Sequence, residues 1–306
     1  ALDTEDGRGE RMLLGEIGNY HRPMITPRGD RVVFSRFSTR KVYVVGWDGT
    51  GVREVADGYG LTVWRDPATG EEWVYVGPVG EREWDLHFVQ AIRRIKLDDP
   101  SVSEPIWDRT KVTVDSFQLS ADGTRASGQF PHPRAGYALL PNISWEPIRR
   151  GCWTSMAPDN SYWVWVFDGL HRNLTLNDPE AERSWTVPID TAPGINGYEV
   201  YHPRWSSHRR FFTMTGPYKV GEKGQALIVA GGRDVEVYVG RFNEDYTAVE
   251  NWLQVTRNEQ GDFYPDLWIA PGPRDNGSAA VRSKRPVAET WPLYRAGLSF
   301  VWDNAR

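Results

Sequence analysis

The sequence predicts an all-β fold: a single β-propeller of four-stranded blades over residues 1–306, with six blades favoured and seven left open. Three observations lead to this prediction. Short apolar stretches alternate with polar residues along the whole chain, and Gly, Pro, Asp or Asn bounds each stretch. A unit that contains such stretches also repeats at intervals of roughly 37 to 60 residues, as four-stranded blades with insertions do.

The apolar stretches are too short and too regularly interrupted for helices. No long segment of 3.6-residue periodicity competes with them, and strands of this length with turns of this regularity indicate a sandwich, a barrel or a propeller. In chain order they are RVVFSRF (31–37), KVYVVGW (41–47), EWVYVG (72–77), YWVWVF (162–167), FFTMTG (211–216), ALIVAGG (226–232), VEVYVGRF (235–242) and LSFVW (298–302).

The repeated unit decides among these architectures. Each copy has a short apolar step, a Pro/Ala-Asp-Gly-type turn and then a strand, as in residues 21–35, 114–130, 151–169 and 201–216. Units are expected to start near residues 21, 61, 115, 152, 202 and 262. One unit cannot bury both faces of its sheet, so successive units must stack around an axis, and flat Trp and Tyr side chains suit that packing.

The Pro/Ala-Asp-Gly repeats resemble those of TolB-type β-propellers, most clearly over residues 20–170 and more loosely to about residue 270. This resemblance implies a protein-interaction scaffold that uses its rim loops. The stretches RMLLGEIG (11–18) and LSFVWDNAR (298–306) are each expected to be one strand, and their pairing would close the ring. A seventh blade would lie in residues 219–260 or 275–302, and residues 271–292 are expected to form a surface loop.

The composition of the chain limits the classes of binding partner. The net charge of −5 argues against a nucleic-acid partner, and no apolar run is long enough to span a bilayer as a helix. The single cysteine, Cys152, excludes an internal disulfide and any CxxC motif. The polar opening ALDTEDGRGE resembles a processed N-terminus, which predicts a periplasmic or secreted protein. We expect a monomer whose partner is a carbohydrate or another protein.

Three histidine–arginine–proline groups are the candidate functional features. They are His21-Arg22-Pro23, His132-Pro133-Arg134 and His202-Pro203-Arg204. His21 and His202 stand just before the first strand of a unit, where residues from different blades of a propeller converge on the central channel. Tyr20, Tyr201, Cys152, Asp262 and Tyr264 are expected to share this register.

These groups have two interpretations. Proline at the start of a strand fixes φ where no ladder hydrogen bond is needed, so the repeat has a purely structural explanation. Alternatively, the channel mouth binds and cleaves an acidic carbohydrate by β-elimination. Propeller polysaccharide lyases, such as oligogalacturonate lyase and some ulvan lyases, are similar in architecture. A non-catalytic scaffold, or an accessory module of a larger protein, is the competing function.

The site hypothesis gives each residue a role. His202 would be the base, Tyr201 or Tyr264 the proton donor, and Arg204 would hold the substrate carboxylate in the catalytic set. The expected substrate-binding residues are Arg22, His21, His132, Arg134, Trp153 and Trp205. A divalent metal ion in the channel would be held by His21, His202 and Asp262.

Overall fold

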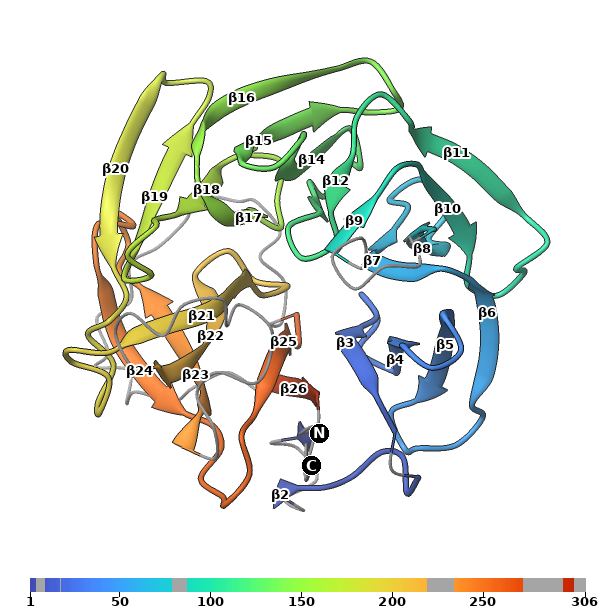
Figure 1. The fold of residues 1–306 in the computed structure, drawn as a ribbon, viewed down its shortest axis with the longest axis horizontal. Helices are drawn as coiled ribbons and strands as arrows, with labels where there is room; N and C mark the ends of the chain where they lie inside the picture. The colour runs from blue at the N-terminus through green and yellow to red at the C-terminus, as the bar shows by residue number, and fades with distance from the viewer. Residues whose placement is uncertain (4–8, 17, 79–86, 219–233, 272–293, 300–306) are drawn as a thin grey trace, which may run out of the picture.

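The strands of this chain form sheets around a central axis (Figure 1). The computed structural model describes residues 1–3, 9–16, 18–78, 87–218, 234–271 and 294–299. Within these ranges there are six four-stranded sheets and one two-stranded sheet. The predicted all-β propeller of four-stranded blades is therefore confirmed. No described helix is long and apolar enough to cross a membrane.

Five blades are each built from four strands in chain order. Blade 1 contains β3 (Tyr20–Ile25), β4 (Arg31–Arg36), β5 (Lys41–Gly46) and β6 (Arg53–Asp57). Blade 2 contains β7 (Tyr59–Arg65), β8 (Glu72–Gly77), β10 (Ile92–Lys96) and β11 (Ser103–Trp107). Blade 3 contains β13 (Gln118–Leu119), β14 (Arg125–Gln129), β15 (Arg134–Leu139) and β16 (Ser144–Arg150).

The other two continuous blades complete this series. Blade 4 contains β17 (Cys152–Met156), β18 (Val164–Phe167), β19 (Asn173–Asp178) and β20 (Arg183–Pro188). Blade 5 contains β21 (Glu199–Trp205), β22 (Phe211–Tyr218), β23 (Glu236–Phe242) and β24 (Val249–Gln254). The two-stranded sheet pairs β9 (Phe88–Val89) with β12 (Val112–Thr113).

The sixth four-stranded sheet is composite and joins the two ends of the chain. Its order is β2 (Gly9–Glu10), β1 (Leu2–Asp3), β26 (Tyr294–Ser299) and β25 (Phe263–Ile269). The sequence count of six included this unit, whereas only five blades are continuous in the chain. The predicted pairing of N-terminal with C-terminal strands occurs, since β1 is antiparallel to β26.

The N-terminal strand was predicted in the wrong place. The described residues of this stretch, 11–16 and 18, contain no strand, and β1 and β2 precede them. Leu13 and Leu14 are apolar for another reason: they pack against the buried cluster of blade 1 that contains Phe34 and Trp47. The predicted strand at 226–232 and most of the predicted loop at 271–292 lie outside the described residues, as do residues 300–306.

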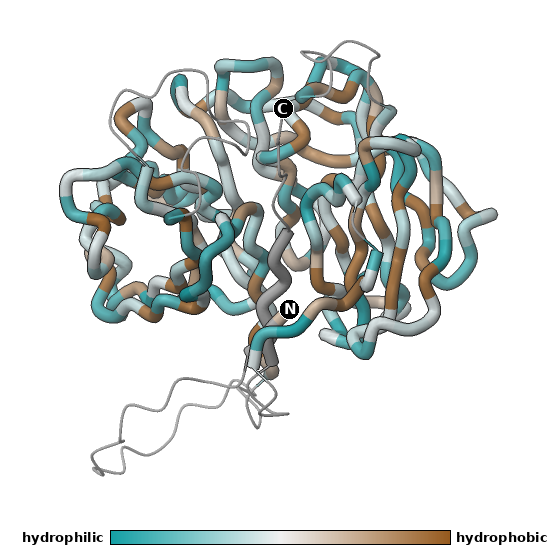
Figure 2. The backbone as a smooth tube through the Cα atoms, turned by 60° about the horizontal axis from the view of Figure 1, so that its bottom comes forward, coloured by the Kyte–Doolittle hydropathy of each residue, from teal (hydrophilic) through white to brown (hydrophobic). Residues whose placement is uncertain are grey.

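The buried apolar residues lie mainly between neighbouring blades. The largest cluster joins blades 4 and 5 to β25, and its centre is a stacked pair of indoles, Trp165 and Trp205, with ring centroids 4.4 Å apart. Figure 2 shows the alternation along the chain, with apolar segments inside strands and hydrophilic segments at turns. Interblade burial therefore explains the high aromatic content of the sequence.

Two turn glycines leave the space in which an indole of the neighbouring blade packs. Gly29 and Gly123 both have positive φ, and a Cβ on either would lie 2.6 Å from an indole of the neighbouring blade. Trp268 donates its Nε1–H to Pro27 O at 3.0 Å, and Trp64 donates its Nε1–H to Ala121 O at 2.9 Å. The same tryptophan-on-turn contact thus joins the composite sheet to blade 1 and blade 2 to blade 3.

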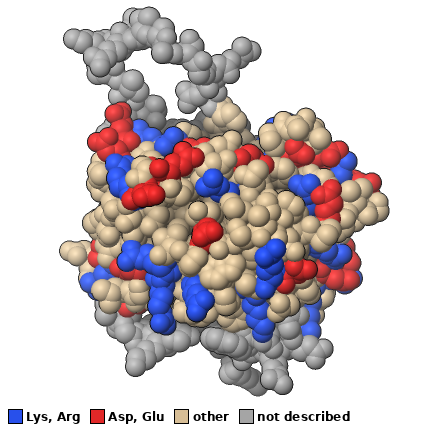
Figure 3. All heavy atoms as spheres, turned by 90° about the horizontal axis from the view of Figure 1, so that it is seen from above, with Lys and Arg blue, Asp and Glu red and all other residues tan. Residues whose placement is uncertain are grey.

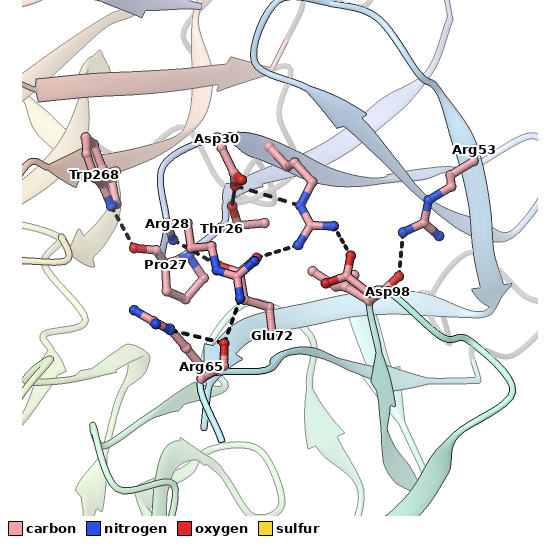
Figure 4. Close-up of polar contacts among 12 residues, drawn as sticks. Thr26, Pro27, Arg28, Asp30, Arg53, Arg65, Glu72, Asp98 and Trp268 are labelled. Atoms are coloured by element: carbon pink, nitrogen blue, oxygen red, sulfur yellow. Dashed lines mark hydrogen bonds and ion pairs between the residues drawn. The ribbon is translucent and has the colours of Figure 1, made fainter. Parts of the chain in front are cut away.

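A buried carboxylate provides a further connection between blades 1 and 2 (Figure 4). The Glu72 side chain is fully buried, and it accepts hydrogen bonds from Arg31 Nη2 at 2.6 Å and from Arg28 N at 2.9 Å. Arg31 also pairs with Asp98, at 2.5 Å. A buried charge is tolerated only when it is paired and hydrogen-bonded, as Glu72 is here.

We expect Gly123→Ala to destabilise the protein more than Gly51→Ala does. Both glycines have positive φ, but a Cβ at Gly51 meets no atom within 4 Å whereas a Cβ at Gly123 meets Trp64. The backbone strain alone costs about 1 kcal/mol, and overpacking against the indole adds about 1–3 kcal/mol. Denaturant unfolding of both variants measures the difference, and equal losses would contradict the tryptophan-on-turn contact.

Candidate functional site

The inner strands of four sheets share a β-bulge near the axis. The pairing register shifts after His21 in β3, after Cys152 in β17, after Tyr201 in β21 and after Phe263 in β25. Each bulge holds a non-glycine residue in the left-handed region: Arg22 (φ 55°), Trp153 (φ 37°), His202 (φ 52°) and Tyr264 (φ 51°). Such conformations cost about 1–3 kcal/mol each and often mark functional or strained positions.

The bulges correct the register inferred from the sequence. The last paired residue before the bulge is His21 in β3 and Tyr201 in β21, so these two positions are equivalent. Arg22 is then equivalent to His202. The sequence analysis equated His21 with His202, which is wrong by one residue. The two imidazoles nevertheless meet near the axis, because both contact Tyr264, with ring centroids 4.8 Å from His21 and 4.3 Å from His202.

The channel residues enclose a cavity of only about 20 Å³. Its lining comprises Arg22, Pro23, Asp115, Trp153, His202, Pro203, Arg204, Tyr264 and Pro265. This volume accommodates about one water molecule. The predicted convergence of residues from different blades is therefore present, but the space between them is too small for a sugar ring.

Arg22 and Asp115 are the charged groups that face each other in this cavity. Arg22 donates through Nη2 to the backbone oxygen of Asp115 at 3.0 Å, and its Nη1 lies 3.9 Å from Asp115 Oδ1. His202 Nδ1 lies 2.9 Å from Thr215 Oγ1. The buried side-chain atoms without a hydrogen-bond partner among the described residues include His21 Nδ1, Arg22 Nη1, Asp115 Oδ1 and His202 Nε2.

Burial decides the protonation of these groups. It lowers the pKa of His21 to about 4 and that of His202 to about 3, so both imidazoles are neutral at pH 7. Burial, with Arg204 nearby, lowers the pKa of Arg22 to about 10, which leaves it charged. Burial also raises the pKa of the Tyr264 phenol well above its usual value.

These values do not suit the predicted acid–base roles. An efficient general base has a pKa near the working pH, whereas His202 binds a proton only in strong acid. His21, Arg22, His202 and Tyr264 are all buried. The arrangement therefore fills and closes the channel at this level instead of presenting its groups to a polymer.

Arg204 is engaged in an ion pair and does not present its charge to the cavity as a free clamp. Its Nε lies 2.7 Å from Asp266 Oδ1, and both side chains are largely buried. The second oxygen of Asp266 accepts a hydrogen bond from Ile25 N at 2.8 Å. Arg204 thus joins blade 5 to the composite sheet, and through Asp266 to blade 1.

Three further predicted residues serve packing or lie outside the cavity lining. Tyr201 is buried and donates to Glu199 Oε2 at 3.2 Å, and its ring contacts Trp153. Trp205 is buried against Trp165, so it cannot stack on a sugar. Asp262 lies near Asn258, and burial beside Glu10 and Glu236 raises its pKa to about 6.

The predicted metal set is not assembled. Asp262 is absent from the lining of the cavity near His202, and His21 Nδ1 has no partner. Across the described ranges, no three His, Cys, Asp or Glu side chains form a group that could hold a metal ion. The thiol of Cys152 is also unsuited to a ligand role, because burial raises its pKa to about 12.

Arg134 and His132 lie on an exposed surface, away from the closed cavity. Arg134 in β15 pairs directly with Arg150 in β16, and Arg149 is its neighbour in the same strand. All three arginines are exposed, and none forms a hydrogen bond or ion pair through its side chain with another described residue. Burial and the nearby charge of Arg150 lower the pKa of His132. Arg134 and Arg150 share one face of the blade, and Arg149 lies on the other face at the same end of β16. We call His132, Arg134, Arg149 and Arg150, which flank this end of the blade, the arginine surface.

Figure 3 views the molecule from the side that carries blade 3 and shows basic side chains gathered along one edge of this face. Sequence reasoning selected His132 and Arg134 but missed Arg149 and Arg150. The adjacent letters RR at 149–150 were visible, but their position opposite Arg134 depends on the pairing of β15 with β16. Asp115 was also missed, although a unit was expected to start there.

Comparison with known proteins assigns no family to this chain. No protein-family model matches the sequence, and no curated protein is significantly similar to it. The propeller architecture thus stands on the structure, and the TolB-type relationship remains a prediction.

We expect the buried histidines to make the protein sensitive to acid. Unfolded histidine titrates near pH 6.5, and the folded-state pKa values lie lower, so protons bind preferentially to the unfolded chain below pH 6.5. The free energy of unfolding is therefore highest above pH 6.5. It falls by about 2–3 kcal/mol for each histidine as the pH is lowered from 6.5 toward 4. Denaturant unfolding at a series of pH values measures this loss.

His202→Asn is the informative variant, because Asn tolerates positive φ and cannot gain this proton. Its unfolding free energy should fall less steeply between pH 6.5 and 4 than that of the unaltered protein. The matched variant His132→Asn, at an exposed turn, should change the slope less. An unchanged slope in His202→Asn would show that this imidazole is not held neutral.

Proposed function

We propose that this protein is a propeller module that binds an acidic saccharide through the arginine surface of blade 3. The ligand would carry carboxylate or sulfate groups. Its hydroxyls would contact the neighbouring outer strands of blades 3 and 4. The closed channel would hold the blades together, and we assign no bond cleavage to it.

The observation that carries this proposal is the direct pairing of Arg134 with Arg150. Like charges on opposite positions of adjacent strands destabilise a sheet. Here both side chains are exposed, and no described carboxylate neutralises them or Arg149. A bound anion would relieve the repulsion, and planar guanidinium groups bind carboxylates and sulfates through paired hydrogen bonds.

The neighbouring groove favours a saccharide over a polyphosphate. A groove of about 380 Å³ lies between β15–β16 and β18–β20, on the face of blade 3 that Arg149 shares. Arg134 and Arg150 lie on the opposite face, so a ligand that reaches both would cross the outer edge of the blade at β16. Its lining includes the aromatic rings of Tyr137 and Tyr162 and the polar side chains of Glu146, Asn177, Asp178 and Glu182. Carboxylates and amides suit the hydroxyls of neutral sugar units, whereas they would repel any anionic unit that entered the groove. The groove would therefore contact uncharged parts of the saccharide, and the arginines its acidic groups.

The alternative function, a TolB-like protein-interaction scaffold, would use the same rim without chemistry. Anionic side chains of a protein partner would also pair with the arginine surface. Binding is therefore measured with pure saccharides that contain no protein. A periplasmic or secreted location suits an acidic glycan ligand and remains a prediction.

The triple variant Arg134→Gln/Arg149→Gln/Arg150→Gln should weaken binding of an oligogalacturonate. Each lost charge-assisted contact is worth about 1–2 kcal/mol, so the affinity should fall by at least about 100-fold. Isothermal titration at several salt concentrations measures both the affinity and its salt dependence, which should also decrease. Neutral dextran should not bind either protein.

A control variant with the same charge change should retain binding: Arg65→Gln/Arg172→Gln/Arg257→Gln, on three other blades. Failure of every uronate and sulfated saccharide to bind the unaltered protein would reject the proposal. Cleavage by β-elimination would produce unsaturated uronate, which is measured by its ultraviolet absorbance. Its accumulation would reject the assignment of a non-catalytic channel.

A further inference from the structure

A second recess lies between blades 1, 2 and 3, and nothing above gives it a role. Its volume is about 780 Å³, within the range of sites that enclose small organic molecules. It forms where the β4–β5 hairpin, the β6–β7 connection, the start of β10 and the end of β11 meet the β15–β16 turn. We call it the three-blade groove.

The inner part of the three-blade groove is apolar. Ile92, Ile106 and Trp107 line it and are almost completely buried, so their side chains have fixed positions. The indole Nε1 of Trp107 already contacts Thr110 at 3.3 Å. This floor therefore offers no unsatisfied donor and suits the apolar body of a ligand.

The rim of the groove carries two arginines and two aspartates. Asp57 lies 3.6 Å from Lys41 Nζ, and Asp108 accepts a hydrogen bond from Asn142 Nδ2 at 2.7 Å. Arg40 and Arg93 also line the groove, and neither side chain has a hydrogen bond or ion pair with another described residue. The two guanidinium groups are thus the donors that the rim offers to an anion.

Arg40 is held in place by its backbone. It adopts φ 53° in the β4–β5 hairpin, its N–H donates to Arg36 O at 2.9 Å, and its carbonyl accepts from Gly58 N at 2.8 Å. Arg93 lies in β10, which pairs with β8 and β11 on both sides. Both guanidinium groups therefore extend from rigid backbone, which limits the entropy lost when they bind a ligand.

We propose that the three-blade groove binds a small organic anion with an apolar, ring-sized body. Arg40 and Arg93 would pair with its carboxylate or sulfonate, and the body would lie against Ile92, Ile106 and Trp107. This site is separate from the arginine surface. Pro141 and Asn142 of the groove lie at the turn of the β15–β16 hairpin, and Arg134 and Arg150 lie at its other end, roughly 20 Å away at 3.3 Å per residue.

The probe is 8-anilinonaphthalene-1-sulfonate, an aromatic sulfonate whose fluorescence rises in apolar sites. It should bind with one-to-one stoichiometry. Arg40→Asn/Arg93→Gln should weaken binding at least about tenfold, since the sulfonate loses both of its charged hydrogen-bond donors. Asn at position 40 keeps the left-handed backbone accessible. The neutral aromatic N-phenyl-1-naphthylamine should bind both proteins equally.

Ala91→Trp tests the location, because it fills the groove without changing charge. It should abolish binding of both fluorophores, while Arg65→Gln and the triple variant of the arginine surface should leave both unchanged. Thermal unfolding of each variant confirms the fold. Three results would overturn the proposal. They are sulfonate binding that survives Ala91→Trp, an affinity of Arg40→Asn/Arg93→Gln equal to that of the unaltered protein, and loss of sulfonate binding in the arginine-surface variant.

Discussion

Asp266 connects three consecutive sheets with a single carboxylate. One oxygen pairs with Arg204 of β21, the other accepts the backbone N–H of Ile25 in β3, and Asp266 itself lies in β25. Both oxygens are used, and the side chain is largely buried, so neither partner can be removed without leaving a buried charge or a buried amide unpaired. This contact lies at the junction where the chain returns to its beginning, and the ring can close only if the sheets on both sides keep their spacing.

Closure has a consequence for the centre of the molecule. It brings the inner strands of different sheets so close that Arg22, Trp153, His202 and Tyr264 enclose a space for about one water molecule. Four strained left-handed residues persist there because the packing on every side leaves them no alternative. A centre that is this full provides stability, and both sites that we propose lie at the rim, where strands end and side chains are exposed.

The rim of blade 3 illustrates how one hairpin can serve two surfaces. At one end of β15–β16, guanidinium groups face each other across the ladder, and at the other end the turn borders an apolar groove with its own arginines. The ladder between them is rigid and continuous, so the distance between the two sites is constant. Although the whole chain is acidic, unpaired arginines lie at both places. Anionic ligands are therefore the natural class for both.

The sequence alone determined the architecture, because alternation and turn chemistry are local properties. The expected unit starts at 21, 61, 152 and 262 fall within two residues of the first residue of an inner strand, the one at 202 lies inside β21, and Gly29 and Gly123 in the turns have positive φ. It also identified most of the residues that converge on the axis. The tertiary structure decided what they do: bulges moved His21 one position out of register with His202, and burial made both imidazoles neutral. Register and desolvation depend on what lies across the ladder and across the axis, and a linear pattern of residue types contains neither.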